Sequence, residues 1–185
     1  MIPDRPDRRP AATIVADPVG PAEFRTMMAG FPTGVGIVTT FDQLGRPWGM
    51  TCSSICSVAL DPPTLLICLR SASPTLDALL RVSTFAVNLL HDGAQPAAEL
   101  FASGDPSRFD RIRWQAAPRY GGPHLVDDAH SVADCVVTRS EVVGDHIVVF
   151  GEVRRIGTTS AVSRALAPLL YGRRRYASWP SAEPL

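Results

Sequence analysis

The segment from Gly49 to Ser54 has side chains suited to binding a polar ring system. It combines one glycine with the hydroxyls of Thr51, Ser53 and Ser54 and the thiol of Cys52, between two apolar stretches. Hydroxyls and backbone amides in an extended segment can donate hydrogen bonds to the ring carbonyls, ribityl chain or phosphate of a flavin. An ordinary polar strand edge explains the same composition equally well, so both interpretations stay open.

A second polar group stands at the predicted start of a helix. Arg70, Ser71 and Ser73 come directly before a proline, a residue favoured in the first helical turn. The helix dipole, free amides and a guanidinium suit a phosphate there, although N-capping by Ser73 explains part of the pattern. Arg81 and Ser83, just before the next predicted strand, offer another phosphate contact or a solvated surface arginine.

Two further places could contact a nucleotide. His146 follows Gly144-Asp145 at a predicted tight turn, where an imidazole titrating near neutral pH could bind a nucleotide or move a proton. An exposed turn histidine without a function is the more common case. The run Arg173-Arg174-Arg175 with Tyr176 could hold a diphosphate and stack on a ring, or it could be solvated surface charge.

The composition indicates one globular domain without a global attraction to nucleic acid. The chain is 45% hydrophobic and 19% charged, and its formal net charge is +0. Three clustered arginines supply little counterion release, so no nucleic-acid partner is expected. The sequence has no Rossmann glycine fingerprint, Walker loop, Gly-x-Ser-x-Gly elbow or His-Glu-x-x-His signature. Any nicotinamide nucleotide must therefore bind without a Rossmann fold.

The cysteines favour an intracellular protein without a metal site. Cys52, Cys56, Cys68 and Cys135 include no Cys-x-x-Cys pair, and no histidine lies close enough in sequence to complete a zinc set. We expect free thiols in a reducing cytoplasm. No apolar run is long enough to cross a bilayer, so no membrane partner is expected. Residues 1–21 lack the apolar region of a signal peptide and are interpreted as a flexible arm.

The elements that must position these residues are mostly short strands. Apolar spacing and proline positions predict helices over 21–28, 73–80 and 95–101. Runs of β-branched and apolar residues predict strands over 34–40, 47–51, 55–60, 64–69, 84–90, 135–143 and 147–153. Turn residues join the first two strands, and the last two, into hairpins, and 55–60 and 64–69 are expected to be buried. Many short strands with few short helices predict a closed or nearly closed β-barrel.

An ordered series of motifs resembles the flavin reductase-like family, the short-chain reductase components of two-component flavin monooxygenases. The motifs are Phe24-Arg25, Pro32-Thr33-Gly34-Val35, Val38-Thr39-Thr40, Gly49 to Ser54, Ser57 to Pro63, Phe85 to Leu90, Phe101-Ala102, Gly144-Asp145-His146 and Gly151-Glu152-Val153. Each motif alone is weakly specific. Their order along nearly the whole chain is highly specific.

The resemblance implies a mainly β protein with short helices, folded as a split β-barrel, FMN-binding flavin reductase-like domain over 22–178, with a C-terminal tail at 179–185. It further implies a homodimer that binds FMN or FAD near the subunit interface, with NADH or NADPH over the isoalloxazine ring. Such an enzyme is an NAD(P)H:flavin oxidoreductase that supplies reduced flavin to a separate monooxygenase. Two alternatives are a split-barrel flavoenzyme that acts directly on a small organic substrate, and a non-catalytic flavin-binding protein.

The resemblance also assigns site residues by position. His146 is the one residue assigned to catalysis, and it positions the nicotinamide nucleotide without acting as a general acid. The implied cofactor contacts are Met50, Thr51, Cys52, Ser53, Ser54, Ser57, Val58, Cys68, Arg70, Ser71, Ala72, Ser73, Arg81, Phe101, His146, Arg173, Arg174, Arg175 and Tyr176. Two departures stand out: Cys52 replaces a common alanine, and the arginine run replaces a segment that often contains glycine. The added charge points towards NADPH.

Overall fold

The computed structural model describes residues 17–117, 120–158 and 166–179. Its helices are α1 (Pro21–Ala29), α2 (Pro74–Val82) and α3 (Gln95–Ser103), with short 3₁₀ turns at Asp92–Ala94 and Arg108–Asp110. Its strands are β1 (Thr33–Gly34), β2 (Gly36–Phe41), β3 (Pro47–Cys52), β4 (Ile55–Leu60), β5 (Pro63–Arg70), β6 (Thr84–Leu90), β7 (Trp114–Gln115), β8 (His124–Leu125), β9 (Ala129–Val143), β10 (His146–Thr158), β11 (Leu169–Gly172) and β12 (Arg175–Ser178). The predicted mainly β fold with short helices is confirmed.

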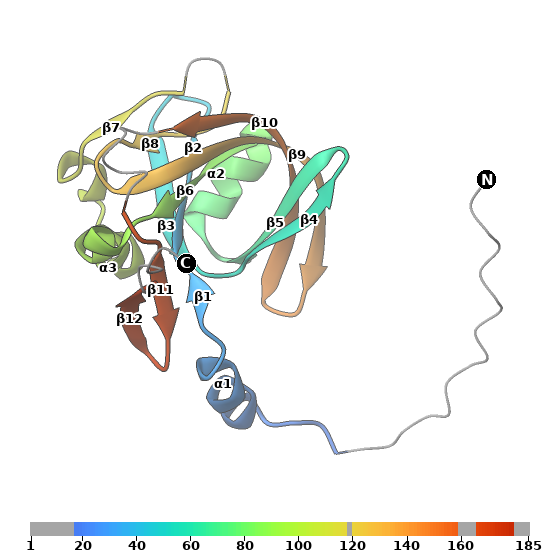
Figure 1. Ribbon diagram of the computed structural model, residues 1–185. Coiled ribbons are helices and arrows are strands. Elements are labelled where there is room, and N and C mark those ends of the chain that lie inside the picture. The colour runs from blue at the N-terminus through green and yellow to red at the C-terminus, as the bar shows by residue number, and fades with distance from the viewer. Residues whose placement is uncertain (1–16, 118–119, 159–165, 180–185) are drawn as a thin grey trace.

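Seven strands form one antiparallel sheet in the order β3-β2-β6-β9-β10-β5-β4. The sheet curls round on itself in Figure 1. Its two edge strands, β3 and β4, are consecutive in the chain and are joined only by Ser53 and Ser54, which we call the seam. Among the described residues no strand pairing joins β3 directly to β4, and the chain passes from one to the other through the seam. The barrel is therefore open at the segment predicted to bind flavin.

A smaller sheet, in the order β1-β11-β12, lies beside this barrel. Helix α1 projects from its end, away from the main sheet, and none of the α1 side chains is buried (Figure 1). Among the described residues no helix is both long enough and apolar enough to cross a membrane. Most of the predicted arm and tail, residues 1–16 and 180–185, lies outside the described residues.

Helix α2 shows how local sequence fixes an element next to the site. The Ser73 side chain accepts a hydrogen bond from the Leu76 amide at 3.4 Å, and Pro74 occupies the first turn. Ser83 ends the helix in the left-handed region, at a φ of 59°. Leu76 and Leu79 are buried in the core between α2 and the main sheet. The N-capping predicted for Ser73 is therefore confirmed.

The β9–β10 hairpin carries His146. Its two-residue loop is Gly144-Asp145, and Gly144 has a φ of 59°, a left-handed conformation that glycine adopts without steric strain. Val143 and His146 are paired across the loop. The predicted hairpin is confirmed, although its strands are longer than the apolar runs indicate. They extend because they pair with β6 and β5 on their outer sides.

The prediction of a buried strand over 55–60 is wrong. Within the described residues, strand β4 is the edge of the main sheet and pairs with β5 alone, and most of its residues are exposed. Leu60 is 89% exposed and Val58 is 47% exposed. An apolar run fits a buried strand and an exposed edge alike, since only the position in the sheet decides between them. This edge leaves one flank of the seam open.

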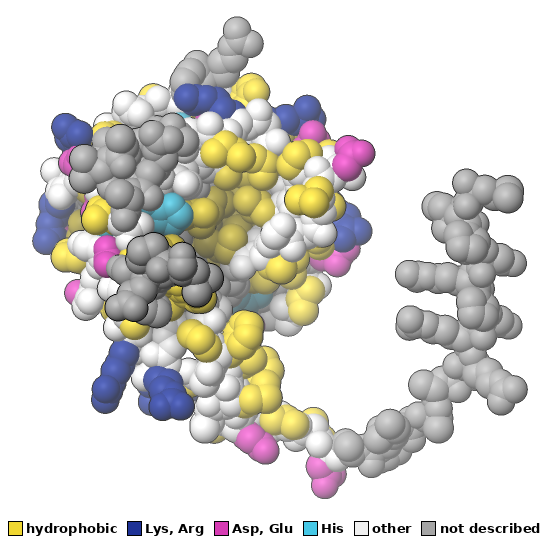
Figure 2. Space-filling view, in the orientation of Figure 1, with side chains coloured by type: hydrophobic (Ala, Val, Ile, Leu, Met, Phe, Trp, Pro, Cys, Tyr) yellow, Lys and Arg dark blue, Asp and Glu magenta, His cyan; other side chains and the backbone are white. Residues whose placement is uncertain are grey.

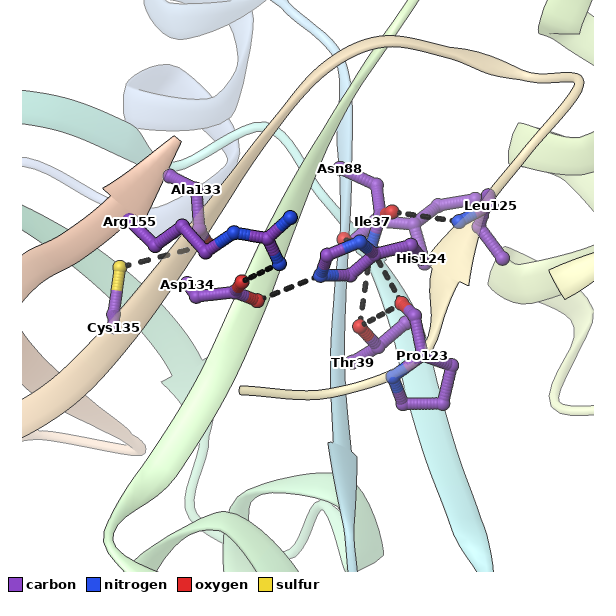
Figure 3. A network of polar contacts seen from close by, with 10 residues as sticks. All are labelled: Ile37, Thr39, Asn88, Pro123, His124, Leu125, Ala133, Asp134, Cys135 and Arg155. Atoms are coloured by element: carbon purple, nitrogen blue, oxygen red, sulfur yellow. Dashed lines mark hydrogen bonds and ion pairs between the residues drawn. The ribbon is translucent and has the colours of Figure 1, made fainter. Parts of the chain in front are cut away.

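A buried polar network holds the opposite side of the barrel together (Figure 3). The Asn88 side-chain amide donates hydrogen bonds to the Ile37 carbonyl at 3.2 Å, the Thr39 hydroxyl at 3.1 Å and the Pro123 carbonyl at 3.2 Å. Its oxygen accepts from the Leu125 amide at 2.8 Å. One side chain therefore joins β2, β6 and β8.

The same network contains a buried charge. Asp134 on β9 is 0% exposed, and its Oδ1 lies 2.7 Å from Nε2 of His124. Its Oδ2 lies 3.5 Å from a guanidinium nitrogen of Arg155 (Figure 3). A β-carbon on Gly121 would overlap the Asp134 carboxylate, so the chain needs glycine there. The aspartate links β8, β9 and β10.

Candidate active site

The seam is fixed to the neighbouring strand β5 by its backbone. The Cys68 amide donates to the Ser54 carbonyl at 3.1 Å, and the Cys52 thiol lies 3.9 Å from the Cys68 carbonyl. Both seam serines are exposed. The Ser54 backbone is therefore fixed at the opening of the barrel, where a ligand can reach both hydroxyls.

A cavity of about 680 Å³ lies over the seam. Ser53, Ser54 and Cys68 line one side, and Arg173 and Arg174 of the β11–β12 turn line another. The structure therefore brings the segment predicted to hold flavin and the segment predicted to hold the nucleotide into a single cavity. Its volume lies in the range of about 300–1,000 Å³ that is usual for cofactor sites.

The outer face of the main sheet extends this cavity towards His146. Side chains alternate along a strand, so Cys68 and Arg70 of β5 point to the same side. Arg70 is paired with His146, which places the histidine on that side as well. The buried residues Ile67 and Leu69 point the other way, into the core. A row of predicted site residues therefore runs along the outer face, from the cavity to the β9–β10 turn.

The His146 ring is held at one of its nitrogens. Its Nδ1 lies 2.8 Å from the carboxylate of Asp145, and this hydrogen bond, with the charge of the imidazole, lowers the pKa of Asp145. Asp145 is therefore ionised near neutral pH. The Asp145 carbonyl also accepts from the Ser71 amide at 3.0 Å, which joins the turn to the loop before α2. No described residue forms a hydrogen bond with Nε2, which faces a possible ligand.

The loop before α2 is tied to β3. The Ser73 hydroxyl lies 3.1 Å from the Met50 sulfur, and the Ser73 amide donates to the Arg70 carbonyl at 2.9 Å. Ser71 and Ala72 are exposed between them. The predicted cofactor contacts Arg70 to Ser73 therefore lie on one loop at the edge of the site, with Met50 beside it. None of them lines the cavity.

Three of the predicted contacts lie elsewhere. The Thr51 hydroxyl donates to the Ala98 carbonyl of α3 at 2.6 Å. Phe101 is 2% exposed and packs in the core. Arg81 forms an exposed ion pair with Asp77 at 3.3 Å. The structure does not bring these side chains to the cavity.

The remaining predicted contacts flank the cavity without lining it. Ser57 and Val58 are exposed on β4, and Arg175 is exposed on β12. Tyr176 packs against Tyr171, with ring centroids 5.0 Å apart. Tyr171 does line the cavity. The tyrosine ring in the cavity is therefore that of Tyr171, the cross-strand neighbour of Tyr176.

Sequence reasoning missed the contribution of α1 to the site. Phe24, Arg25 and Met28 line the cavity, although the motif Phe24-Arg25 was noted only as part of a resemblance. The Arg173 amide donates to the Ala29 carbonyl at the end of α1, which holds the helix against the β11–β12 turn. In the sequence, the apolar spacing over 21–28 pointed to this helix, and such spacing cannot show what a helix packs against.

The β11–β12 turn holds two arginines in an unusual backbone conformation. Arg173 has a φ of 50° and Arg174 a φ of 61°, both in the left-handed region. A residue with a side chain costs about 1–2 kcal/mol in that region relative to the right-handed one. Glycine would relieve this strain. The chain keeps two cations there instead.

The four thiols differ in expected reactivity because they differ in burial. Burial raises the pKa of Cys52 to about 11, against the hydrogen bond from the Ser54 amide, which lowers it. Burial raises the pKa of Cys135 to about 12. Burial, followed by the neighbouring Cys56, raises the pKa of Cys68. Cys56 is exposed and lines the cavity.

Alkylation of the folded protein at neutral pH is therefore expected to label Cys56 first and to leave Cys52 and Cys135 unmodified, because only the thiolate reacts. Peptide mass spectrometry measures each site. Since thiolate formation at Cys52 requires a pH near 11, its labelling rate should keep rising up to that pH. Bound flavin should protect Cys56. Equal labelling of Cys56 and Cys52 at neutral pH would contradict the structure.

Comparison with known proteins places this geometry in a family. The model of the flavin reductase like domain matches residues 28–180. A flavin reductase (NADPH) of Lentzea aerocolonigenes is 47% identical over 92% of this chain and 94% of its own length. A flavin reductase (NADH) of Kitasatospora aureofaciens is 40% identical over 86% of this chain and 82% of its own length.

Two further similar proteins are a subunit of a monooxygenase and a reductase of known structure. The reductase subunit HsaB of a flavin-dependent monooxygenase of Rhodococcus jostii is 36% identical over 88% of this chain and 80% of its own length. The NADH:FAD oxidoreductase SgcE6 of Streptomyces globisporus, solved with NAD and FAD fragments, has a TM-score of 0.80 and 31% identity over 91% of this chain and all of its own. The chain therefore belongs to the flavin reductase like family.

Proposed function

We propose that this protein is an NAD(P)H:flavin oxidoreductase that reduces FMN or FAD in the cavity over the seam and supplies the reduced flavin to a separate monooxygenase. The observation that carries the proposal is the single cavity that joins Ser53, Ser54 and Cys68 to Arg173 and Arg174. The similarity to flavin reductases and to a reductase subunit of a monooxygenase supports it.

The residues of the cavity fit a flavin. Its polar groups are hydroxyls, thiols and guanidiniums, and none of the described residues that line it is acidic, so an anionic phosphate or a ring carbonyl meets no carboxylate among them. Phe24, Phe31 and Tyr171 supply the apolar and aromatic surface that a flat ring requires. When bound, the flavin supplies the hydride acceptor and the nicotinamide the donor.

The protein side of the reaction is orientation. Ser53 and Ser54 hold the ring edge through hydroxyls and amides, and the loop from Arg70 to Ser73, at the N-terminus of α2, holds the phosphate end. Met28 and Phe24 of α1 line another part of the cavity and cover it only partly. A reaction between two bound rings gains most from such alignment, and no side chain needs to form a covalent bond.

His146 positions the nicotinamide nucleotide from the outer face of the sheet. Replacing it with alanine is expected to raise the KM for the nucleotide about tenfold, the effect of one lost hydrogen bond to a charged group, with kcat changed by less than about twofold. His146→Gln should recover part of the loss. A large fall in kcat with an unchanged KM would instead make His146 a proton donor, contrary to the proposal.

We include a homodimer in the proposal, because one protomer leaves its cavity partly uncovered. Phe24 is 54% exposed, Met27 62% and Phe31 63%, all around α1. Figure 2 shows apolar atoms along α1 and a hollowed apolar face on the barrel above it. A second protomer would bury the apolar surface around α1. The free thiols of the described residues also fit work in a reducing cytoplasm.

An experiment on the release of reduced flavin distinguishes this function from that of a flavoenzyme that keeps its cofactor. The protein is held behind a dialysis membrane with NADPH or NADH and an excess of FMN, without oxygen. Reduced FMN should accumulate on the far side until the excess is consumed. Reduction that stops at one equivalent of protein would overturn the supply role and leave a retained flavin.

A further inference from the structure

The arginines around the cavity differ from most others in the described part of the chain. Seven arginines have acidic partners within 4.0 Å: Arg46, Arg81, Arg111, Arg113, Arg139, Arg154 and Arg155. No ion pair to a described residue is formed by Arg25, Arg173 or Arg174, and all three line the cavity. Arg70, Arg108 and Arg175 form no ion pair to a described residue either, but they do not line the cavity. Arg25, Arg173 and Arg174 are exposed, so their charges are free to bind an anion that enters the cavity.

The backbone holds these three cations in one place. The Arg173 amide donates to the Ala29 carbonyl at 2.6 Å. Arg25 lies one helical turn before Ala29, on the same face of α1. The left-handed conformations of Arg173 and Arg174 keep both residues at the tip of the β11–β12 turn at a local energetic cost. A helix and a hairpin distant in sequence thus present one cluster to the cavity.

We propose that Arg25, Arg173 and Arg174 form a phosphate-binding cluster that recognises the 2′-phosphate of NADPH and so makes this protein favour NADPH over NADH. This rests on the proposed function. Guanidiniums are suited to a phosphate dianion because they bind its oxygens in pairs. The proposed function assigns the flavin phosphate to Arg70 and the N-terminus of α2. The cluster on the other side of the cavity is therefore left to the second nucleotide.

The test compares Arg25→Gln, Arg173→Gln and Arg174→Gln, singly and together, with Arg154→Gln as a matched control at an exposed arginine outside the cavity. Glutamine removes the charge and keeps a side chain of similar length, so the backbone strain of the turn is unchanged. We expect kcat/KM for NADPH to fall about tenfold for each arginine, as for a lost charged hydrogen bond, and kcat/KM for NADH to fall less than about threefold. Arg154→Gln should change neither.

Binding without turnover provides an independent readout. Wild-type protein should bind adenosine 2′,5′-bisphosphate more tightly than adenosine 5′-monophosphate in calorimetry, and the triple variant should bind both equally. Parallel losses for NADPH and NADH would overturn the proposal. A raised KM for FAD with an unchanged KM for FMN and an unchanged NADPH preference would assign the cluster to the FAD diphosphate, and would also overturn it.

Failure of this inference differs from failure of the proposed function. If the wild-type protein oxidises neither nucleotide when flavin is present, the function itself is wrong. If it oxidises both with the same kcat/KM, and the variants leave that ratio unchanged, only the role of the cluster is wrong.

Discussion

Replacing Ser54 with tryptophan is expected to lower flavin reduction at least about 100-fold, the loss typical when reacting groups are displaced by about 1 Å. Ser54 is exposed and lines the cavity, so an indole there occupies the space over the seam without disturbing the core. The loss should fall on the KM for flavin and on kcat together. Steady-state oxidation of the nucleotide at several flavin concentrations measures both.

Ser140→Trp is the matched control for this substitution. Ser140 is an exposed serine in β9 and does not line the cavity. Its indole should leave the activity within about twofold of wild type, since surface substitutions away from a site have small effects. Thermal unfolding of both variants shows whether each is folded. A folded Ser54→Trp variant with full activity would mean that flavin binds elsewhere.

Replacing Asp134 with alanine is expected to lower the free energy of unfolding by about 3–5 kcal/mol, the usual loss when one partner of a buried ion pair is removed. Asp134 is 0% exposed and lies between His124 and Arg155. Its removal leaves the His124 ring nitrogen buried without a partner and opens a space beside Gly121. Denaturant unfolding monitored by circular dichroism measures the change.

Asp145→Ala is a matched control because it removes an aspartate from a histidine pair of similar length in an exposed position. The Asp145–His146 pair is 2.8 Å long, and the side chain of Asp145 is 90% exposed. Such a solvated pair stabilises the fold very little, so Asp145→Ala should leave the unfolding transition almost unchanged. Equal destabilisation by Asp134→Ala and Asp145→Ala would show that the buried network does not hold β8, β9 and β10 together.

The elements of this fold could be predicted where residues adjacent in the sequence determine the local structure. Gly144-Asp145 between β-branched runs predicts a two-residue hairpin, and Ser73-Pro74 predicts a helix start; both are observed. These signals need only a few adjacent residues, because loop conformation and capping are local properties. The same holds for the hairpin of β2 and β3, with its turn near Gly45.

Features decided by partners distant in the sequence could not be predicted. The apolar run of β4 suggests burial, yet its place at the sheet edge exposes Leu60. Asp134 lies just outside the predicted strand 135–143, and its partners His124 and Arg155 come from two other strands. Neither hydrophobic periodicity nor motif spacing contains this pairing information.

The residues of the candidate site also fall into two groups, those that the sequence could predict and those that it could not. The seam residues Ser53 and Ser54 were identified from their composition and their place in an ordered set of motifs, and the cavity contains them. Phe101 belongs to one of those motifs, but its side chain is in the core. Arg25 was not identified, because its position beside Arg173 depends on a hydrogen bond between α1 and a turn near the other end of the chain.

The measurement that tests the central claim most directly is the oxidation of NADPH and NADH by the purified protein with and without added FMN or FAD, followed by the loss of reduced-nicotinamide absorbance. We expect many turnovers per protein when flavin is added and almost none without it, with the rate strongly reduced in Ser54→Trp. If folded wild-type protein consumes neither nucleotide at any flavin concentration, it is not a flavin reductase.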